Sequence, residues 1–168
     1  MVEIRQLQVE EAEDFWNLLK TLDVETTYMM YEPEERERRT NLEELRDDIR
    51  RNVAGGNDFL QVAIENNEMV GYIRAERGRF NRIFHTAYIV IGVLNVYSGK
   101  GIGTAFFEKL DAWAKENGIV RLELTVECRN LAAKHLYEKA GFQTEGRRVK
   151  SMLVDGRFVD EYYMAKIL

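Results

Sequence analysis

The feature that most constrains the fold of this chain is a glycine-rich segment at residues 98–104, Ser-Gly-Lys-Gly-Ile-Gly-Thr. The apolar run before it, residues 88–94, predicts a buried strand, and the apolar spacing of residues 106–114 predicts a helix after it. Glycines at such a junction let the backbone approach a ligand closely. The unpaired N–H groups of the first helical turn favour an anion, above all a phosphate. The segment therefore predicts a site for a phosphate-bearing ligand.

Size and charge narrow the class of protein. The chain has 168 residues, 45% of them hydrophobic, which is enough for one packed domain, and we expect a single domain over residues 1–168. A net charge of −5 argues against non-specific nucleic-acid binding. The single cysteine, Cys128, suits a reducing compartment, and no run approaches the 18 apolar residues typical of a membrane span. We therefore expect a cytoplasmic protein with no membrane or nucleic-acid partner.

Turn signals and apolar periodicity give an element order of β, α, α, β, β, β, α, β, α, β, β. Asn66-Asn67 and Asp155-Gly156 predict tight hairpin turns, and Asn41 and Asn130 predict helix starts. Because hairpins flank one strand–helix–strand unit, we expect a mixed α/β (α+β) fold with a mixed sheet, neither a Rossmann domain nor a helical bundle. The predicted strands are 2–7, 59–65, 69–77, 84–96, 120–126, 142–153 and 158–168.

The glycine segment fits neither common nucleotide fingerprint. A Walker loop needs Gly-x-x-x-x-Gly-Lys followed by Ser or Thr, whereas Lys100 here precedes Gly101. A Rossmann loop needs Gly-x-Gly-x-x-Gly, and Thr104 stands where its third glycine belongs. The ligand is therefore not assigned by this segment alone.

A second motif resembles a known family. Residues 130–142, Asn-Leu-Ala-Ala-Lys-His-Leu-Tyr-Glu-Lys-Ala-Gly-Phe, are similar to the Asn-x-x-Ala-x-x-Leu-Tyr-x-x-x-Gly-Phe signature of the GNAT acyl-CoA N-acyltransferases. Residues 98–103 lie on that family's pyrophosphate loop, Gln/Arg-x-x-Gly-x-Gly/Ala, with Ser98 in place of Gln or Arg. The resemblance covers nearly the whole chain. It implies a mostly antiparallel central sheet flanked by helices, acetyl-CoA as acyl donor and no metal.

The resemblance also implies roles for particular residues. Tyr137 would be the general acid that protonates the departing thiolate. Val93 would offer backbone groups to the pantetheine arm and the acyl carbonyl, and Asn130 would touch the same arm. Together with Tyr137, the residues expected to bind the donor are Val93, Ser98, Gly99, Lys100, Gly101, Ile102, Gly103, Thr104, Asn130 and Ala133.

The general base is left open among Glu127, Glu123, His85 and a water molecule. An acceptor amine must lose a proton before it attacks, and each of these side chains is able to accept one. Glu127 is favoured because it stands at the C-terminal end of its predicted strand, where the site is expected to open. Cys128 has no evident histidine partner, so we expect direct transfer rather than an acyl-cysteine route.

By the same resemblance, the acceptor side is expected to be built from the first two helices and their linker, residues 21–41. Tyr28 and Tyr31 would form an apolar wall, Glu32 would attract a cation, and His85 would complete the site. Residues 150–164 resemble the tail of the small-molecule acetyltransferases that include diamine and spermidine enzymes, and Asp160 and Glu161 are within that tail.

The prediction from sequence is thus an acetyl-CoA-dependent N-acetyltransferase that acts on a primary amine of a small molecule, such as a polyamine. The alternatives are acetylation of an amino acid, a peptide or a protein N-terminus, and a non-catalytic acyl-CoA sensor. Members of the family often form dimers, so the resemblance implies a homodimer.

Overall fold

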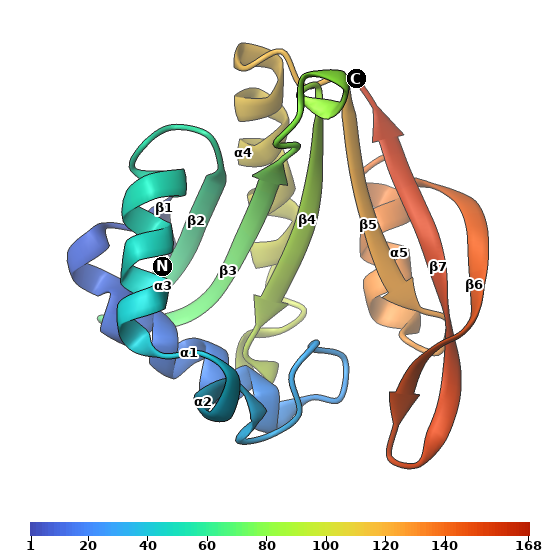
Figure 1. Cartoon of the computed structure of the whole chain (residues 1–168), viewed down its shortest axis with the longest axis horizontal. Helices are drawn as coiled ribbons and strands as arrows, with labels where there is room; N and C mark the ends of the chain where they lie inside the picture. Colours follow the sequence, from blue (N-terminus) through green and yellow to red (C-terminus); the bar gives the residue numbers. More distant parts are fainter. The chain divides into compact units, whose positions relative to one another are not determined.

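The computed structural model describes all residues from Met1 to Leu168 (Figure 1). The chain divides by its internal contacts into two compact units, one made of Met1–Glu76 and Val90–Phe106 and the other of Arg77–Ile89 and Phe107–Leu168. The strands are ordered β1-β2-β3-β4-β5-β7-β6 in one seven-stranded sheet. The described pairings are antiparallel except that of β4 with β5, so the predicted mixed, mostly antiparallel fold is confirmed.

The first unit is built on an antiparallel meander. β1 (Glu3–Gln6) pairs with β2 (Phe59–Glu65), which pairs with β3 (Glu68–Arg77). The turn between β2 and β3 holds Asn66 and Asn67 at φ of 52° and 63°, the left-handed region that the hairpin prediction required. The predicted hairpin is confirmed.

Helices cover one face of this meander. They are α1 (Ala12–Glu25), α2 (Glu35–Arg39) and α3 (Leu42–Asp48), with single-turn helices η1 (Val9–Glu11) and η2 (Ile49–Val53) at their ends. In Figure 1, α1 and α3 lie on the same side of β1–β3. Phe15 and Leu22 of α1 and Ile49 of η2 join Val62 and Tyr72 in one buried core, and the Phe15 and Tyr72 rings meet edge to face at 5.1 Å.

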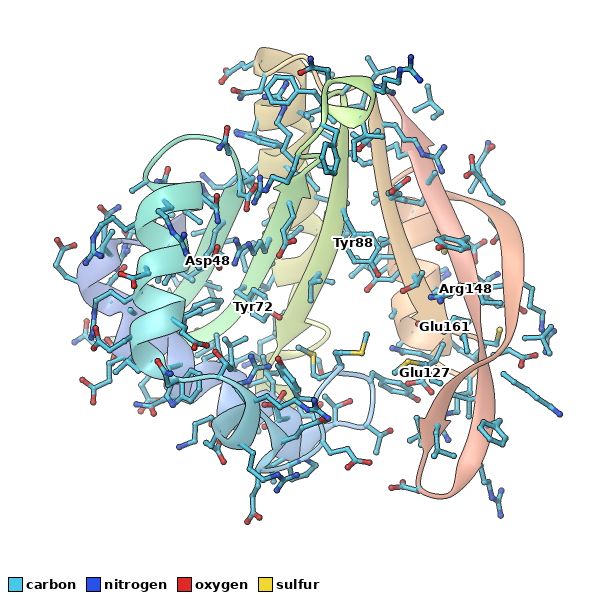
Figure 2. All side chains as sticks on the ribbon, in the orientation of Figure 1. Asp48, Tyr72, Tyr88, Glu127, Arg148 and Glu161 are labelled. Carbon is cyan, nitrogen blue, oxygen red and sulfur yellow. The ribbon has the colours of Figure 1, made fainter.

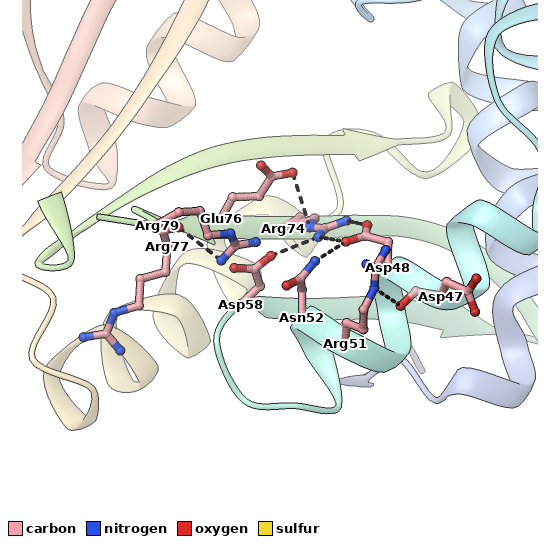
Figure 3. Close-up of polar contacts among 9 residues, drawn as sticks. All are labelled: Asp47, Asp48, Arg51, Asn52, Asp58, Arg74, Glu76, Arg77 and Arg79. Carbon is pink, nitrogen blue, oxygen red and sulfur yellow. Dashed lines mark hydrogen bonds and ion pairs between the residues drawn. The ribbon is translucent and has the colours of Figure 1, made fainter. Parts of the chain in front are cut away.

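A buried arginine links the helical layer to the strands. Arg74 of β3 donates to Asp48 at the end of α3 and to Asp58 before β2, at 3.0 and 2.9 Å from its Nη2 atom (Figure 3). Asn52 of η2 donates to the same Asp48 carboxylate at 2.7 Å. Because buried charges are tolerated only when paired, these carboxylates fix where α3 ends relative to the meander.

The second unit is built around a long hairpin. β5 (Arg121–Glu127) pairs with β7 (Arg157–Ile167), and β7 pairs with β6 (Gln143–Val154). The hairpin turn has Asp155 and Gly156 at φ of 49° and 76°, as Asp-Gly predicted. α4 (Ile102–Glu116) begins in the first unit and continues into this one, and α5 (Leu131–Lys139) follows β5.

The two faces of the β5–β7 pair differ. On β7, Lys166 contacts Asp111 of α4, and the Tyr162 ring lies 5.2 Å from Lys134 Nζ of α5. These two β7 residues share one face because side chains alternate along a strand, so α4 and α5 cover that face. Glu161 and Tyr163 project from the other face.

The long central strand is shorter than predicted. The prediction placed one strand over 84–96, whereas β4 spans Thr86–Val93, with single-turn helices η3 (Asn81–Ile83) before it and η4 (Asn95–Tyr97) after it. Apolar residues continue through both turns, and this is why the run was taken as one strand. The region 21–39, which has no clean apolar period, also contains α2. No helix in the chain is both long and apolar enough to cross a lipid bilayer.

Candidate active site

The glycine segment forms the turn that leads into α4. Gly99 and Gly101 adopt φ of 72° and 83°, and a Cβ atom at either position would meet nothing within 4 Å. Backbone conformation rather than crowding therefore requires glycine here. The first hydrogen bond into the helix runs from the Ala105 N–H to the Gly101 carbonyl at 3.1 Å. The N–H groups of Ile102, Gly103 and Thr104 precede it at the helix N-terminus, which is a donor set that suits a phosphate.

Two side chains of this turn are held locally. The Ser98 hydroxyl donates to the Asn95 carbonyl at 2.7 Å, so it secures the turn where the family's Gln or Arg would be a longer side chain. Lys100 Nζ lies 5.0 Å from the centre of the Tyr97 ring and is exposed. The backbone and one lysine are thus the groups available to an anion, and they fit a pyrophosphate. Val93 is the last residue of β4, five positions before this turn.

In the second unit, Asn130 and Tyr137 are placed by α5. The Asn130 side chain caps the helix by accepting from the Ala133 N–H at 3.3 Å, as predicted. Tyr137 is 8% exposed, and its ring packs edge to face on Phe107 of α4 at 5.8 Å and near Phe142 at 6.3 Å. Burial raises the pKa of the Tyr137 phenol well above its usual range, and the Tyr88 phenol adds to the effect. The phenol is therefore protonated at neutral pH.

Glu127 ends β5 on the face opposite α5. In the β5–β7 ladder it stands directly across from Glu161, and the two side chains lie close together in Figure 2. Glu127 is 5% exposed; Arg129 Nε donates to its Oε1 atom at 3.1 Å, and its Oε2 atom is buried without a hydrogen-bond partner. Burial raises the pKa of Glu127 despite Arg129, and the charge of Glu161 raises it further. This carboxylate is a stronger base than an exposed one.

The rival bases are placed differently. Glu123 lies on the same face of β5 but is ion-paired with Arg121 at 2.7 Å. His85 is exposed and precedes β4; its carbonyl accepts from Val120 and Arg121 at the start of β5. Because β5 advances about 3.3 Å per residue, His85 and Glu127 lie at opposite ends of that strand. The two side chains therefore do not meet at one reacting amine, and only Glu127 shares the strand end that leads into α5.

The predicted acceptor residues Tyr28, Tyr31 and Glu32 lie together in the loop after α1. Arg36 of α2 donates two hydrogen bonds to the buried Asp23 of α1, at 2.7 and 3.0 Å, and covers the Tyr31 ring at 4.6 Å. One face of Tyr31 is therefore already occupied. Tyr28 and Glu32 are exposed. No group of three or more His, Cys, Asp or Glu side chains is placed to hold a metal ion.

Comparison with known proteins assigns the family. A family model described as the acetyltransferase (GNAT) family matches residues 16–142, a span that includes both the glycine turn and α5. The chain belongs to the GNAT acetyltransferase family. Both sequence motifs that suggested the resemblance fall within the matched span.

Individual relatives agree with this membership. The chain is 32% identical over 110 residues to L-amino acid N-acetyltransferase AaaT of Escherichia coli K12, a match that covers 63% of this chain and 66% of AaaT. A GNAT acetyltransferase structure from Streptococcus pneumoniae has a TM-score of 0.93 and 27% identity, covering 100% of this chain and 99% of the other. The fold is also similar to that of yncA from Salmonella typhimurium, solved with acetyl-CoA, at a TM-score of 0.87 and 18% identity over 100% and 94% of the two chains.

One feature of this GNAT chain was only partly foreseen. Glu161 was noted in the C-terminal tail, but its burial opposite Glu127 was not predicted. Along β7, Glu161 and Tyr163 occupy one face and Tyr162 and Met164 the other, but this alternation does not distinguish the buried Glu161 from the exposed Tyr163. Glu161 faces Glu127 because of the register between β5 and β7, two strands that are far apart in the sequence.

Proposed function

We propose that this GNAT chain transfers the acetyl group of acetyl-CoA directly to a primary amine of a small molecule. The observation that carries the proposal is the position of Tyr137, a buried phenol on the helix that begins at the family's motif asparagine. The glycine turn at the start of α4 offers backbone donors for the pyrophosphate of the acyl donor. The proposal takes residues 1–168 as a single GNAT domain.

In the proposed reaction, Glu127 accepts a proton from the acceptor ammonium, so that the nitrogen lone pair can attack the thioester carbonyl carbon. The new C–N bond forms, the C–S bond breaks, and the Tyr137 hydroxyl donates its proton to the departing sulfur. Tyr137 approaches β5–β7 from the face opposite Glu127.

Residues of the first unit are assigned to the donor and the acceptor. The turn residues Ser98–Thr104 and the end of β4 at Val93 would hold the pyrophosphate and the pantetheine arm. The loop with Tyr28, Tyr31 and Glu32 would form part of the acceptor site. Since Glu127 is the proposed base, His85 is assigned at most to acceptor contacts away from the reacting nitrogen.

A second acceptor class has specific support. AaaT, the relative that shares 32% identity over 110 residues, is named as an L-amino acid N-acetyltransferase. That relationship favours an amino acid acceptor, whereas the acidic residues Glu32, Glu127 and Glu161 favour a cation without a carboxylate of its own. Because the chain spans 66% of the length of AaaT, both acceptor classes are proposals.

The test is a product assay. The purified chain is incubated with acetyl-CoA and separate pools of polyamines, monoamines, amino acids, peptides with free N-termini and aminoglycosides. Released CoA and acetylated amine are quantified together by mass spectrometry. We expect equal amounts of CoA and acetyl-amine from one pool. Binding of CoA without product in any pool would support the non-catalytic sensor instead, and absence of CoA binding would overturn both.

A further inference from the structure

Two buried carboxylates lie opposite each other at the end of β5, and each is ion-paired with one arginine. Glu127 and Glu161 are directly opposite each other in an antiparallel ladder, and they are 5% and 6% exposed. Side chains opposite each other in such a ladder are near neighbours, and like charges in that position are destabilising. The pair therefore depends on its cations, which are Arg148 of β6 at Glu161 and the half-exposed Arg129 at Glu127.

The hydrogen bonds of the pair are unequal. Glu161 Oε1 accepts from Arg148 Nη1 at 3.2 Å and from the Ser151 hydroxyl at 2.8 Å, both on β6. Glu127 Oε1 accepts from Arg129, and Glu127 Oε2 accepts from nothing. A buried oxygen without a donor costs about 1–3 kcal/mol, and more when it is charged. The missing partner is thus a hydrogen-bond donor.

We propose that Glu127 and Glu161 together bind an ammonium group of the acceptor, with Glu127 Oε2 accepting one of its N–H bonds. This inference rests on the proposed amine acetylation and names the group of the acceptor that is recognised. An ammonium supplies a compact positive charge and several donors in one group, so it answers both the like-charge pairing and the unpartnered oxygen.

Arg129 is the side chain that the ammonium would displace. Its Nε atom donates to Glu127 Oε1 and its side chain is 46% exposed, whereas Glu161 has two donors on β6, Arg148 and Ser151. An ammonium that replaces Arg129 at Glu127 leaves the two β6 contacts of Glu161 intact. Glu161 therefore serves as a binding and positioning residue beside the proposed base.

The experiment measures binding apart from turnover. Isothermal titration of the CoA-bound protein uses 1,5-diaminopentane and, as its uncharged counterpart of equal length, pentane-1,5-diol. We expect the diamine to bind and the diol not to bind. Replacing Glu161→Gln or Glu127→Gln should weaken diamine binding by at least about tenfold, in line with the loss of one charged hydrogen bond.

Glu145→Gln is the matched control. Glu145 is also a strand carboxylate paired with an arginine, Arg121, at 3.0 Å, but it is exposed on β6. This variant should bind the diamine like the wild type. Equal binding of diamine and diol, no diamine binding, or unchanged binding in both pair variants would overturn the ammonium site. The comparison of the two probes on wild-type protein holds even if a variant fails to fold.

The two proposals fail in different ways. If the diamine binds and Glu161→Gln weakens it, but no amine is ever acetylated, the ammonium site stands and the transferase function fails. If amines are acetylated while Glu161→Gln alters neither diamine binding nor KM, the function stands and the ammonium site fails.

Discussion

Glu127 and Glu161 occupy directly opposed positions of the β5–β7 ladder, and each is contacted by its own arginine while one Glu127 oxygen has no partner. Burial of two like charges in register works against stability. Functional sites are where such arrangements are commonly retained, because they tune proton affinity. The buried acidic pair at the end of β5 is therefore the basis for proposing a functional site there.

Replacing Tyr137 with phenylalanine should lower kcat by about 100-fold or more, the usual contribution of a general acid. The ring contacts with Phe107 and Phe142 remain, so affinity for acetyl-CoA and the melting temperature should change little. Steady-state kinetics with titration of CoA checks both. Tyr162→Phe, on the β7 face beneath Lys134, is the control and should keep wild-type kcat. Equal kcat in both variants, with chemistry rate-limiting, would rule out the acid role.

The pH dependence of kcat/KM should show an acidic limb set by Glu127. Activity falls as pH drops because the base becomes protonated, and burial places this limb above the usual glutamate pKa of about 4.3. The charge of Glu161 raises the pKa of Glu127, so Glu161→Gln should move the limb to lower pH. If the acidic limb of the Glu161→Gln profile stays at the wild-type pH, Glu127 is not the titrating base.

We expect Glu127 to make folding stability fall with rising pH, whereas an ordinary ion-paired carboxylate makes it rise. Its pKa is raised by folding, so the ionised form destabilises the native state, and stability is lost as pH rises through that pKa. Glu127→Gln should therefore raise the melting temperature by about 2–4 °C at pH 7.5, equivalent to roughly 1 kcal/mol in a chain of this size. The gain should shrink as pH falls. Thermal unfolding at several pH values provides the measurement, and a variant less stable at pH 7.5 contradicts the expectation.

The glycine turn can be tested with a matched pair of substitutions. Gly99 and Gly118 have φ of 72° and 70°, and neither has a neighbour within 4 Å of an added Cβ. Alanine at either position should cost about 1–2 kcal/mol of stability through the same left-handed backbone strain. Only Gly99→Ala should also weaken CoA binding, because Gly118 follows the C-terminal end of α4. Calorimetric titration with CoA separates them, and equal affinities would argue against the turn as the pyrophosphate site.

Two helix caps offer a similar comparison. Asn41 and Asn130 each accept from a backbone N–H three residues on, at the starts of α3 and α5. Alanine at either position should cost about 1 kcal/mol. Asn130→Ala should in addition lower kcat/KM, because it loosens the first turn of the helix that holds Tyr137. If Asn41→Ala lowers kcat/KM as much as Asn130→Ala does, the loss of activity comes from reduced stability of the whole fold.

Local signals were sufficient for much of the fold. The Asn66-Asn67 and Asp155-Gly156 turns, the Asn41 and Asn130 caps and the glycine turn are each encoded within a few residues, and each formed as expected. The strand predicted over 84–96 was too long because hydrophobicity alone does not distinguish a strand from the single turns η3 and η4 that flank it.

By itself, the sequence determined the mixed fold, the family and the residues that begin α4 and α5, since short-range backbone preferences and motifs specify these features. Only the tertiary structure distinguished the two candidate carboxylates on β5. Glu123 and Glu127 share a strand face and look alike in sequence, but Arg121 pairs with the first, while the second is buried opposite Glu161 with an oxygen left unpaired. Burial and cross-strand charge set the proton affinity of a carboxylate, and both come from residues distant in the chain.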